Sequence, residues 1–387
     1  MSKYENMNDI VNYLITWLCY GDEEAAKRVA YTADEKELEH YDVIIVPNGH
    51  LGNDLVVPEL KHPEVEFPAK GKAVVRTDIV YAAFFFTSRA EELMVTDRDE
   101  HGRFAARFSI LSQKSRLQIP RLDEYARFLM KILDLPLPEP GFNHIYLTHD
   151  VDSISRYRHL RGAVGGILRG ETKQVWQALL DLHRDPLYTF PWIIDTDRQV
   201  PRAETIYFIK NTPGKGYDYP QYRLWGRDWR QLKKLLRHNN AYLGIHGSYY
   251  GSIPPIKYSR MYRAHYLRCS IYQMQRVADA GYTDDFTMGF ADQAGFRLQT
   301  TRAVRWINPK TMELTRLTLH PLLVMDNTLS QTNYMNLGED ESYFLCERLL
   351  DKVKTHHGDV CLLWHNNSFA DDSYHRSLYP KILEMLR

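Results

Sequence analysis

The 387-residue chain is predicted to be an α/β protein, with a parallel sheet or barrel in residues 139–387 and a smaller α/β domain in residues 1–138. Three observations predict this. Short apolar runs alternate with amphipathic helical stretches in the second part, which is the pattern of parallel strands joined by crossover helices. The prolines of Leu135–Gly141 (LPLPEPG) are typical of a linker. Apolar residues make up 44% of the chain and charged residues 25%, which allows a sizeable core.

The first region combines helical and strand-like patterns. Helices are predicted over Asn8–Cys19 and Leu122–Leu133, and a buried strand over Tyr41–Pro47 (YDVIIVP). A second apolar run covers Ile79–Phe86, and the segment 88–104 that follows it is dense in charge.

The second region contains five short apolar runs that are predicted to be strands. Helices are predicted between them over Asp228–His238 and Lys257–Ala280, and His265 is assigned to packing inside the second of these. The strand runs are Ile145–Thr148, Thr205–Ile209, Tyr242–Ile245, Phe286–Phe290 and Val360–Trp364.

Polar, chemically capable residues follow directly on four of these five runs. The carboxyl ends of parallel strands meet at one end of a barrel or sheet, where sites usually form. We therefore expect these side chains to gather into one site. They are Asp150 and Asp152, His246, Asp292 and Arg297, and His365.

The sequence Thr148–Asp152 (THDVD) places two carboxylates two residues apart, on the same side of an extended segment. One of them can bind a metal, and the other can take a proton from water that the metal has acidified. The same pair could instead cap the next helix.

Two histidines and an arginine extend this constellation. His246 ends an apolar strand and is a candidate metal ligand, and His365 is a candidate general acid. Arg297 could hold a carboxylate ionised and oriented. Each also has a structural alternative, as a core histidine bonded to backbone or as a surface ion pair.

Several function classes receive no support. Lys and Arg number 49, as do Asp and Glu, so no global field attracts nucleic acid, although residues 154–170 carry arginines and no acid. These arginines form either a solvated, mobile segment or a clamp for an anionic substrate.

No nucleotide-binding GxGxxG or GxxxxGK[ST] pattern occurs, and the four cysteines form no CxxC pair. The apolar stretch Val11–Tyr20 is too short to span a membrane, and a cytoplasmic location is expected.

Taken together, these residues resemble the polysaccharide deacetylases, the NodB-homology or carbohydrate esterase 4 family, over residues 142–387. The resemblance implies an irregular (β/α) barrel, a divalent metal with zinc as the expected ion, and hydrolysis of N- or O-acetyl groups on sugars. It implies that Asp150 is the base, Asp152 and His246 are metal ligands, Arg297 orients Asp150 and His365 is the acid. Residues 88–104 (SRAEELMVTDRDEHGRF) and Pro120–Tyr125 resemble a domain that precedes the barrel in one bacterial subfamily.

The chain departs from the family pattern at one position. The family carries a second histidine four residues after the first, and Tyr250 stands there. Tyr250, Ser252, a water or a residue from elsewhere in the chain could complete the ligand set. Tyr250, Asp292, Trp364 and Asn366 are also candidates for contacting the sugar, because aromatic faces stack on pyranose rings and amides bond hydroxyls.

Three functions follow as hypotheses. The first is a metal-dependent hydrolase that removes an acetyl group from an acylated sugar or glycan precursor. The second, suggested by Tyr250, is a degenerate barrel that binds carbohydrate without turnover. The third is another hydrolase or isomerase on a similar barrel. The oligomeric state is not predicted.

Overall fold

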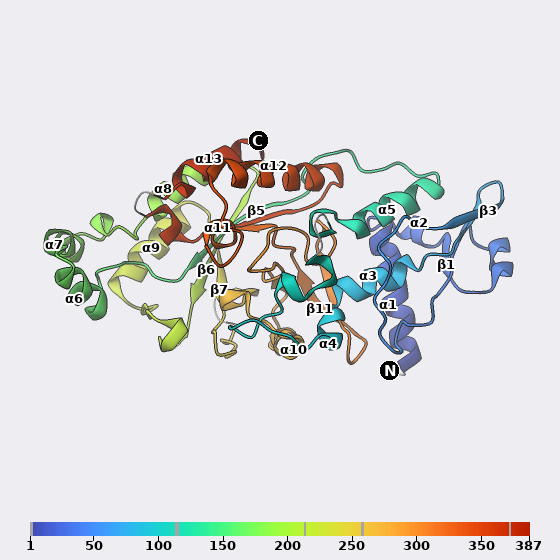
Figure 1. The fold of residues 1–387 in the computed structure, drawn as a ribbon, viewed down its shortest axis with the longest axis horizontal. Coiled ribbons are helices and arrows are strands. Elements are labelled where there is room, and N and C mark those ends of the chain that lie inside the picture. The colour runs from blue at the N-terminus through green and yellow to red at the C-terminus, as the bar shows by residue number, and fades with distance from the viewer. Residues whose placement is uncertain (1–2, 113–115, 213, 257–258, 371–372) are drawn as a thin grey trace.

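The computed structural model describes residues 3–112, 116–212, 214–256, 259–370 and 373–387. The chain forms a mixed α/β structure with two sheets, and most of the strand pairs in both are parallel (Figure 1). In the part of the chain so described, no helix combines the length and apolar character needed to cross a bilayer.

The smaller sheet lies in the first part of the chain and has the strand order β1-β2-β4-β3. Strand β2 pairs in parallel with both β1 and β4, and β3 pairs antiparallel with β4. The elements are α1 (Lys3–Leu18), α2 (Glu23–Ala26), β1 (Val29–Tyr31), β2 (Val43–Ile45), β3 (Val65–Ala69), β4 (Lys72–Val75), α3 (Ile79–Thr87), α4 (Glu91–Met94) and α5 (Arg121–Ile132).

The predicted helices at the two ends of this region and the strand between them are confirmed by α1, α5 and β2. The apolar run at Ile79–Phe86 forms helix α3, and every residue of that helix is buried. Its start is fixed by Asp78, whose carboxylate accepts a hydrogen bond from the backbone N–H of Tyr81.

The larger sheet has nine strands in the order β10-β11-β9-β8-β7-β6-β5-β13-β12. All neighbours pair in parallel except β10 and β11. Within the described ranges the pairing runs in one line from β10 to β12, so the parallel sheet is confirmed and barrel closure stays a prediction. The strands are β5 (Ile145–Val151), β6 (Glu204–Lys210), β7 (Tyr242–His246), β8 (Met261–Arg263), β9 (Asp284–Asp285), β10 (Val304–Asn308), β11 (Glu313–Leu319), β12 (Val324–Met325) and β13 (Val360–Leu363).

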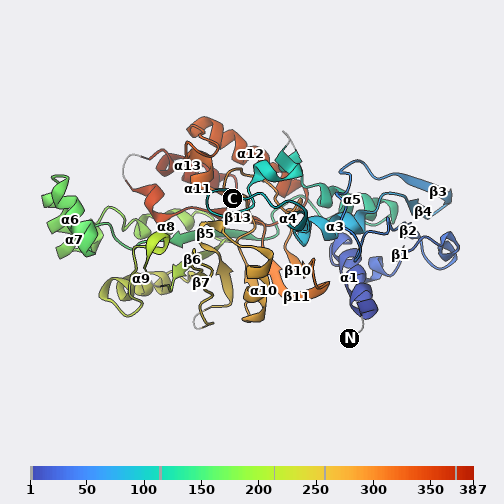
Figure 2. The same cartoon turned by 60° about the horizontal axis from the view of Figure 1, so that its bottom comes forward.

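Among the residues that the structure describes, eight α-helices accompany this sheet. Helices α12 and α13 run together along one side of it, and α6 and α7 form one end of the molecule in both views (Figures 1 and 2). They are α6 (Leu160–Leu168), α7 (Thr172–Leu180), α8 (Phe190–Asp197), α9 (Arg227–His238), α10 (Ile271–Asp279), α11 (Asp326–Ser330), α12 (Glu339–Thr355) and α13 (His375–Glu384).

Two predicted elements of the second region are wrong. Residues 257–258 of the predicted helix Lys257–Ala280 lie outside the described residues, and the rest is not one helix, because it contains strand β8, a 3-10 turn at His265–Leu267 and then helix α10. The run Phe286–Phe290 is not a strand. Asp285 accepts hydrogen bonds from the backbone N–H and the hydroxyl of Thr287, which turns the chain out of the sheet directly after β9.

The two regions share a hydrophobic core. One continuous cluster of buried side chains includes Leu14, Phe84 and Leu129 from the first region and Trp306 and Leu317 from the second. Helix α1 accordingly packs against β11, and α3 packs against β10. The first region is therefore packed directly onto the β10–β11 end of the larger sheet.

Candidate metal centre and pocket

Three side chains converge at the carboxyl ends of strands β5, β7 and β8 in the larger sheet. Asp152 follows β5, His246 ends β7, and His265 follows β8 by two residues. One ligand atom from each lies within 4.8 Å of the other two. The Asp152 Oδ1 atom is 3.1 Å from His265 Nε2 and 3.6 Å from His246 Nε2.

Two of these atoms lack a hydrogen-bond partner although they are buried: Asp152 Oδ1 and His246 Nε2. Buried polar atoms are normally paired, so two unpaired atoms that face each other indicate space for a ligand between them. The opposite nitrogen of each histidine is held in place. His246 Nδ1 lies 3.2 Å from the carbonyl of Arg263, and His265 Nδ1 lies 2.9 Å from Asp218 Oδ1.

This donor set fits a divalent metal. Zinc sites that carry out chemistry commonly use two or three nitrogen and carboxylate ligands and leave a position open. Ligating histidines typically direct their second nitrogen at a carboxylate or a backbone carbonyl, as His265 and His246 do. Without a metal, burial opposes ionisation of Asp152, but the His265 charge and the nearness of both imidazoles lower its pKa well below the usual value.

Asp150 lies within β5, two residues before Asp152, and contacts the same cluster. Its Oδ2 atom is 3.6 Å from His246 Nε2, and its Oδ1 atom accepts a hydrogen bond of 3.0 Å from Arg263. Arg263 is fully buried, donates also to Thr148 and Phe286, and lies over the ring of Phe208. The Asp150 carboxylate is therefore fixed in one orientation.

His365 follows β13 and reaches the same point. Its Nε2 atom is 3.9 Å from a carboxylate oxygen of both Asp150 and Asp152, and its Nδ1 atom is 2.8 Å from Asp326 Oδ1. Burial opposes protonation, but the charge and hydrogen bond of Asp326 raise the pKa of His365 to about 10. The imidazole is thus held as a proton donor at neutral pH.

These groups open into a cavity of about 410 Å³, a size common for small-molecule sites. Lys210 lies in its wall, 3.9 Å from Asp152, and burial lowers the pKa of this amine. The remaining wall is mostly aromatic and polar, with three aliphatic side chains. It includes Tyr217, Tyr219, Tyr266, Leu267, Met325, Asn327, Gln331, Asn333, Tyr334, Leu363 and Asn367.

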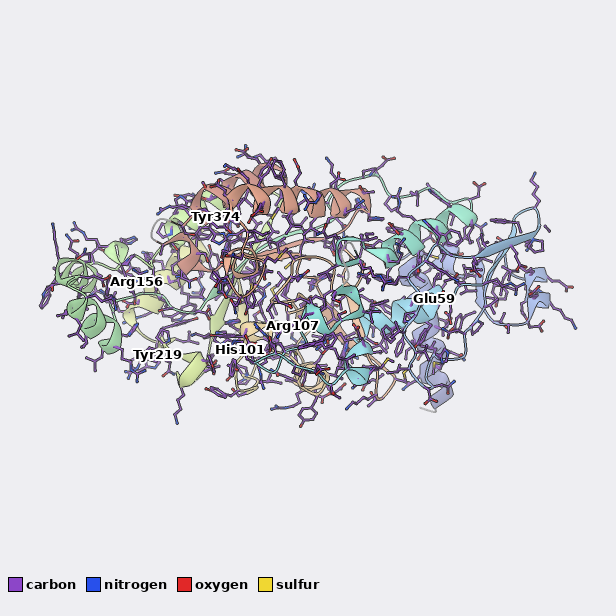
Figure 3. The ribbon with its side chains drawn as sticks, in the orientation of Figure 1. Glu59, His101, Arg107, Arg156, Tyr219 and Tyr374 are labelled. Carbon is purple, nitrogen blue, oxygen red and sulfur yellow. The ribbon has the colours of Figure 1, made fainter. Side chains whose placement is uncertain are left out.

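The first region of the chain also contributes to this cavity. His101 and Arg103 both line it. Figure 3 labels His101 and also Tyr219, a lining residue from the second region of the chain. Arg103 donates to Asp99, to the carbonyl of Tyr266 and to the hydroxyl of Tyr334. The segment that precedes residue 138 is therefore part of the pocket wall.

The expectation that Arg297 orients Asp150 is wrong. Arg297 donates to Glu92 at 2.7 Å and to the carbonyl of Gly289, and it belongs to a buried ion cluster with Arg89. The arginine that orients Asp150 is Arg263.

The four residues suggested as sugar contacts lie outside the pocket lining. Asn366 donates to the carbonyls of Ser153 and Leu187, and Trp364 is buried and donates to His375. Asp292 accepts hydrogen bonds from the backbone N–H groups of Ala106 and Arg107. Tyr250 is 60% exposed and is not one of the three converging ligands.

The third residue of the candidate ligand set is His265, which the sequence analysis assigned to helix packing. A signal for it exists in the sequence. Arg263 and His265 are two residues apart after a short extended run, the same spacing as Asp150 and Asp152. Lys210, Asp218 and Asp326 were also missed, since each acts through a contact distant in sequence.

Comparisons with known proteins give limited similarity. Residues 5–138 match the model of a family of unknown function, DUF7033, which covers less than half of the chain. No curated protein matches the sequence.

Two solved structures are similar to the chain. A candidate polysaccharide deacetylase from Mycobacterium smegmatis is 12% identical with a TM-score of 0.42, over 65% of this chain and 85% of that one. A candidate polysaccharide deacetylase involved in O-antigen biosynthesis, from Bordetella bronchiseptica, is 12% identical with a TM-score of 0.33, over 64% and 84%. These values do not establish a common fold.

Proposed function

We propose that the chain is a metal-dependent hydrolase that removes an acetyl group from an N- or O-acetylated sugar or glycan precursor. The observation that carries this proposal is the meeting of a carboxylate, Asp150, and a protonated imidazole, His365, with the ligand set Asp152, His246 and His265. A base, an acid and a metal site in one pocket are the parts that hydrolysis of an amide or ester requires.

The side chains have separate roles in this proposal. Asp152, His246 and His265 would hold a divalent ion, which when bound polarises a carbonyl group and acidifies water. Asp150 takes a proton from the attacking water, and Arg263 keeps its carboxylate aimed at that water. His365, charged through its contact with Asp326, gives its proton to the leaving amine or alkoxide.

The character of the pocket supports a sugar as the substrate. Tyr217, Tyr219 and Tyr266 offer aromatic faces on which the apolar face of a pyranose ring can stack. Asn327, Gln331 and Asn333 offer amide donors and acceptors for hydroxyl groups. The alternative of a non-catalytic sugar-binding protein was motivated by Tyr250, and His265 now offers the missing nitrogen ligand.

The first experiment compares metal content and acetate release for the purified wild type, Asp150→Asn, His265→Ala and Tyr250→Phe. The wild type and Tyr250→Phe should hold about one zinc per chain after incubation with zinc, and release acetate from an acetylated glucosamine oligomer. Asp150→Asn should keep the metal and lose turnover, and His265→Ala should lose both.

Two results would overturn the proposal. A wild type that binds no divalent ion even in excess zinc would remove the metal site. Unchanged acetate release by Asp150→Asn would remove the proposed base.

A further inference from the structure

Helices α6 and α7 form a hairpin at the end of the molecule opposite the smaller sheet (Figures 1 and 2). It contains the arginine-bearing segment 154–170 that the proposed reaction does not use. The hairpin has a small buried cluster of its own, made by Tyr157, Val175 and Ala178, and Arg158 ties it to the body through Asp228. Most of its surface faces solvent.

The apolar side chains of this hairpin are unusually exposed. Leu160, Leu168 and Leu180 are 82%, 81% and 80% exposed, and Trp176 is 60% exposed. Val164, Ile167 and Leu179 are exposed as well. Their spacing places Leu160, Val164, Ile167 and Leu168 on one face of α6, and Trp176, Leu179 and Leu180 on one face of α7. Exposed apolar faces on two adjoining helices indicate an interaction site.

The segment that forms the hairpin is also rich in basic residues. Within residues 154–186, basic side chains outnumber acidic ones. They are Arg156, Arg158, Arg161, Arg169, Lys173 and Arg184, against Glu171, Asp181 and Asp185. The exposed ones include Arg161, Arg169 and Lys173. An excess of positive charge opposes docking of a second identical copy through the same surface, because cations would face cations. It favours an anionic partner.

We propose that the α6–α7 hairpin docks on an anionic lipid surface. Exposed leucines and a tryptophan together with exposed basic residues are the composition of helices that lie in the membrane interface. The apolar side chains would enter the boundary between headgroups and acyl chains, and Arg161, Arg169 and Lys173 would lie near the lipid phosphates.

The hairpin is joined to the wall of the pocket. His159, which caps the start of α6, lies 2.9 Å from the hydroxyl of Tyr219, and Arg161 lies over the Tyr219 ring. Tyr219 lines the cavity that contains Asp150 and Asp152. For the proposed hydrolase, on which this last step rests, docking would bring the pocket close to the lipid surface.

The test is co-sedimentation of the full chain with vesicles of phosphatidylcholine, either alone or mixed with phosphatidylglycerol. The wild type should bind the mixed vesicles, and less as salt is raised. A variant with Leu160→Ser, Leu168→Ser and Leu180→Ser should bind roughly tenfold or more weakly, since each leucine loses its apolar contact. Lys173→Glu with Arg169→Glu should also weaken binding.

The matched control changes three apolar residues exposed elsewhere: Phe67→Ser, Tyr272→Ser and Phe344→Ser. It should bind as the wild type does, and circular dichroism should show all variants folded. No vesicle binding by the wild type, or equal binding by the leucine variant, would overturn the proposal. So would a wild-type dimer that the leucine substitutions dissolve, because a second copy would then cover the hairpin. The vesicle assay uses no sugar, so its result is independent of the hydrolase activity.

Discussion

Replacing Asp218 with asparagine tests whether His265 is a metal ligand, without touching the ligand set itself. Asp218 is buried, and its Oδ1 atom lies 2.9 Å from His265 Nδ1 and accepts from the backbone N–H of Tyr249. Its other oxygen accepts from Ser248. Burial opposes ionisation, but the hydrogen bonds from His265 and Ser248 lower the pKa of Asp218, so it is a carboxylate at neutral pH.

The expected loss can be worked from these contacts. An asparagine can keep its amide oxygen toward His265 and its amide nitrogen toward the hydroxyl of Ser248, so the geometry is preserved and the negative charge is removed. Loss of such a partner typically weakens metal affinity 10–100-fold. We therefore expect the Kd for zinc to rise by about that factor, or about 1.4–2.8 kcal/mol of binding free energy.

The measurement is competition for zinc against a chromophoric chelator, at constant pH. Asp292→Asn is the control, because that carboxylate also accepts backbone N–H groups but lies outside the pocket lining. It should bind zinc as the wild type does. An unchanged Kd for Asp218→Asn would refute the view that Asp218 supports His265. An unchanged Kd for His265→Ala would refute the ligand set itself.

Three further predictions concern the surroundings of the site. In the folded, metal-free protein the pKa of His365 is raised from 6.5 to about 10, so its charged form adds stability that is fully present below pH 6.5 and is lost as the pH rises through 10. The Tm of the metal-free protein should therefore fall between pH 6.5 and 10. The fall should be smaller in His365→Gln. Arg263→Gln should lower the free energy of unfolding by about 3–5 kcal/mol in urea denaturation, because Asp150 would lose its buried partner, whereas the exposed Arg227→Gln should change it by about 0.5 kcal/mol or less. Arg103→Ala should raise KM about tenfold with a smaller change in kcat, because the carbonyl of Tyr266 and the hydroxyl of Tyr334 in the pocket wall lose their hydrogen-bond donor. An unchanged KM would mean that the first region does not shape the substrate site.

Much of the larger sheet could be predicted because several of its strands are continuous apolar runs. Strands β5 and β13 are buried along their whole length, and such strands carry no polar alternation that could be confused with a surface segment. Position at a strand's carboxyl end was enough to predict four site residues: Asp150, Asp152, His246 and His365. The structure brings all four together.

His265 could not be found in this way because strand β8 has only three residues and no apolar run. The helix predicted over Lys257–Ala280 did not take account of an N-cap residue within it. Ser270 precedes the true start of α10, and its hydroxyl accepts from the backbone N–H of Gln273. A helix that begins at residue 271 leaves His265 on the segment that precedes it.

The role of Arg263 was missed for a different reason. Its partner Asp150 is distant in sequence, as is Glu92 from Arg297. Local sequence shows which residues carry charge, but the pairing of two buried charges depends on how the strands and helices assemble.

The ion cluster of Arg89, Glu92 and Arg297 has a consequence for how the molecule unfolds. Glu92 comes from the first region and neutralises Arg297 of the second, and all three side chains are buried. Separating the regions at the proline-rich segment would leave a buried guanidinium without its counter-ion and uncover the shared apolar cluster. The two regions should therefore melt as one cooperative unit, and a protease cut near residue 138 should release no independently stable fragment.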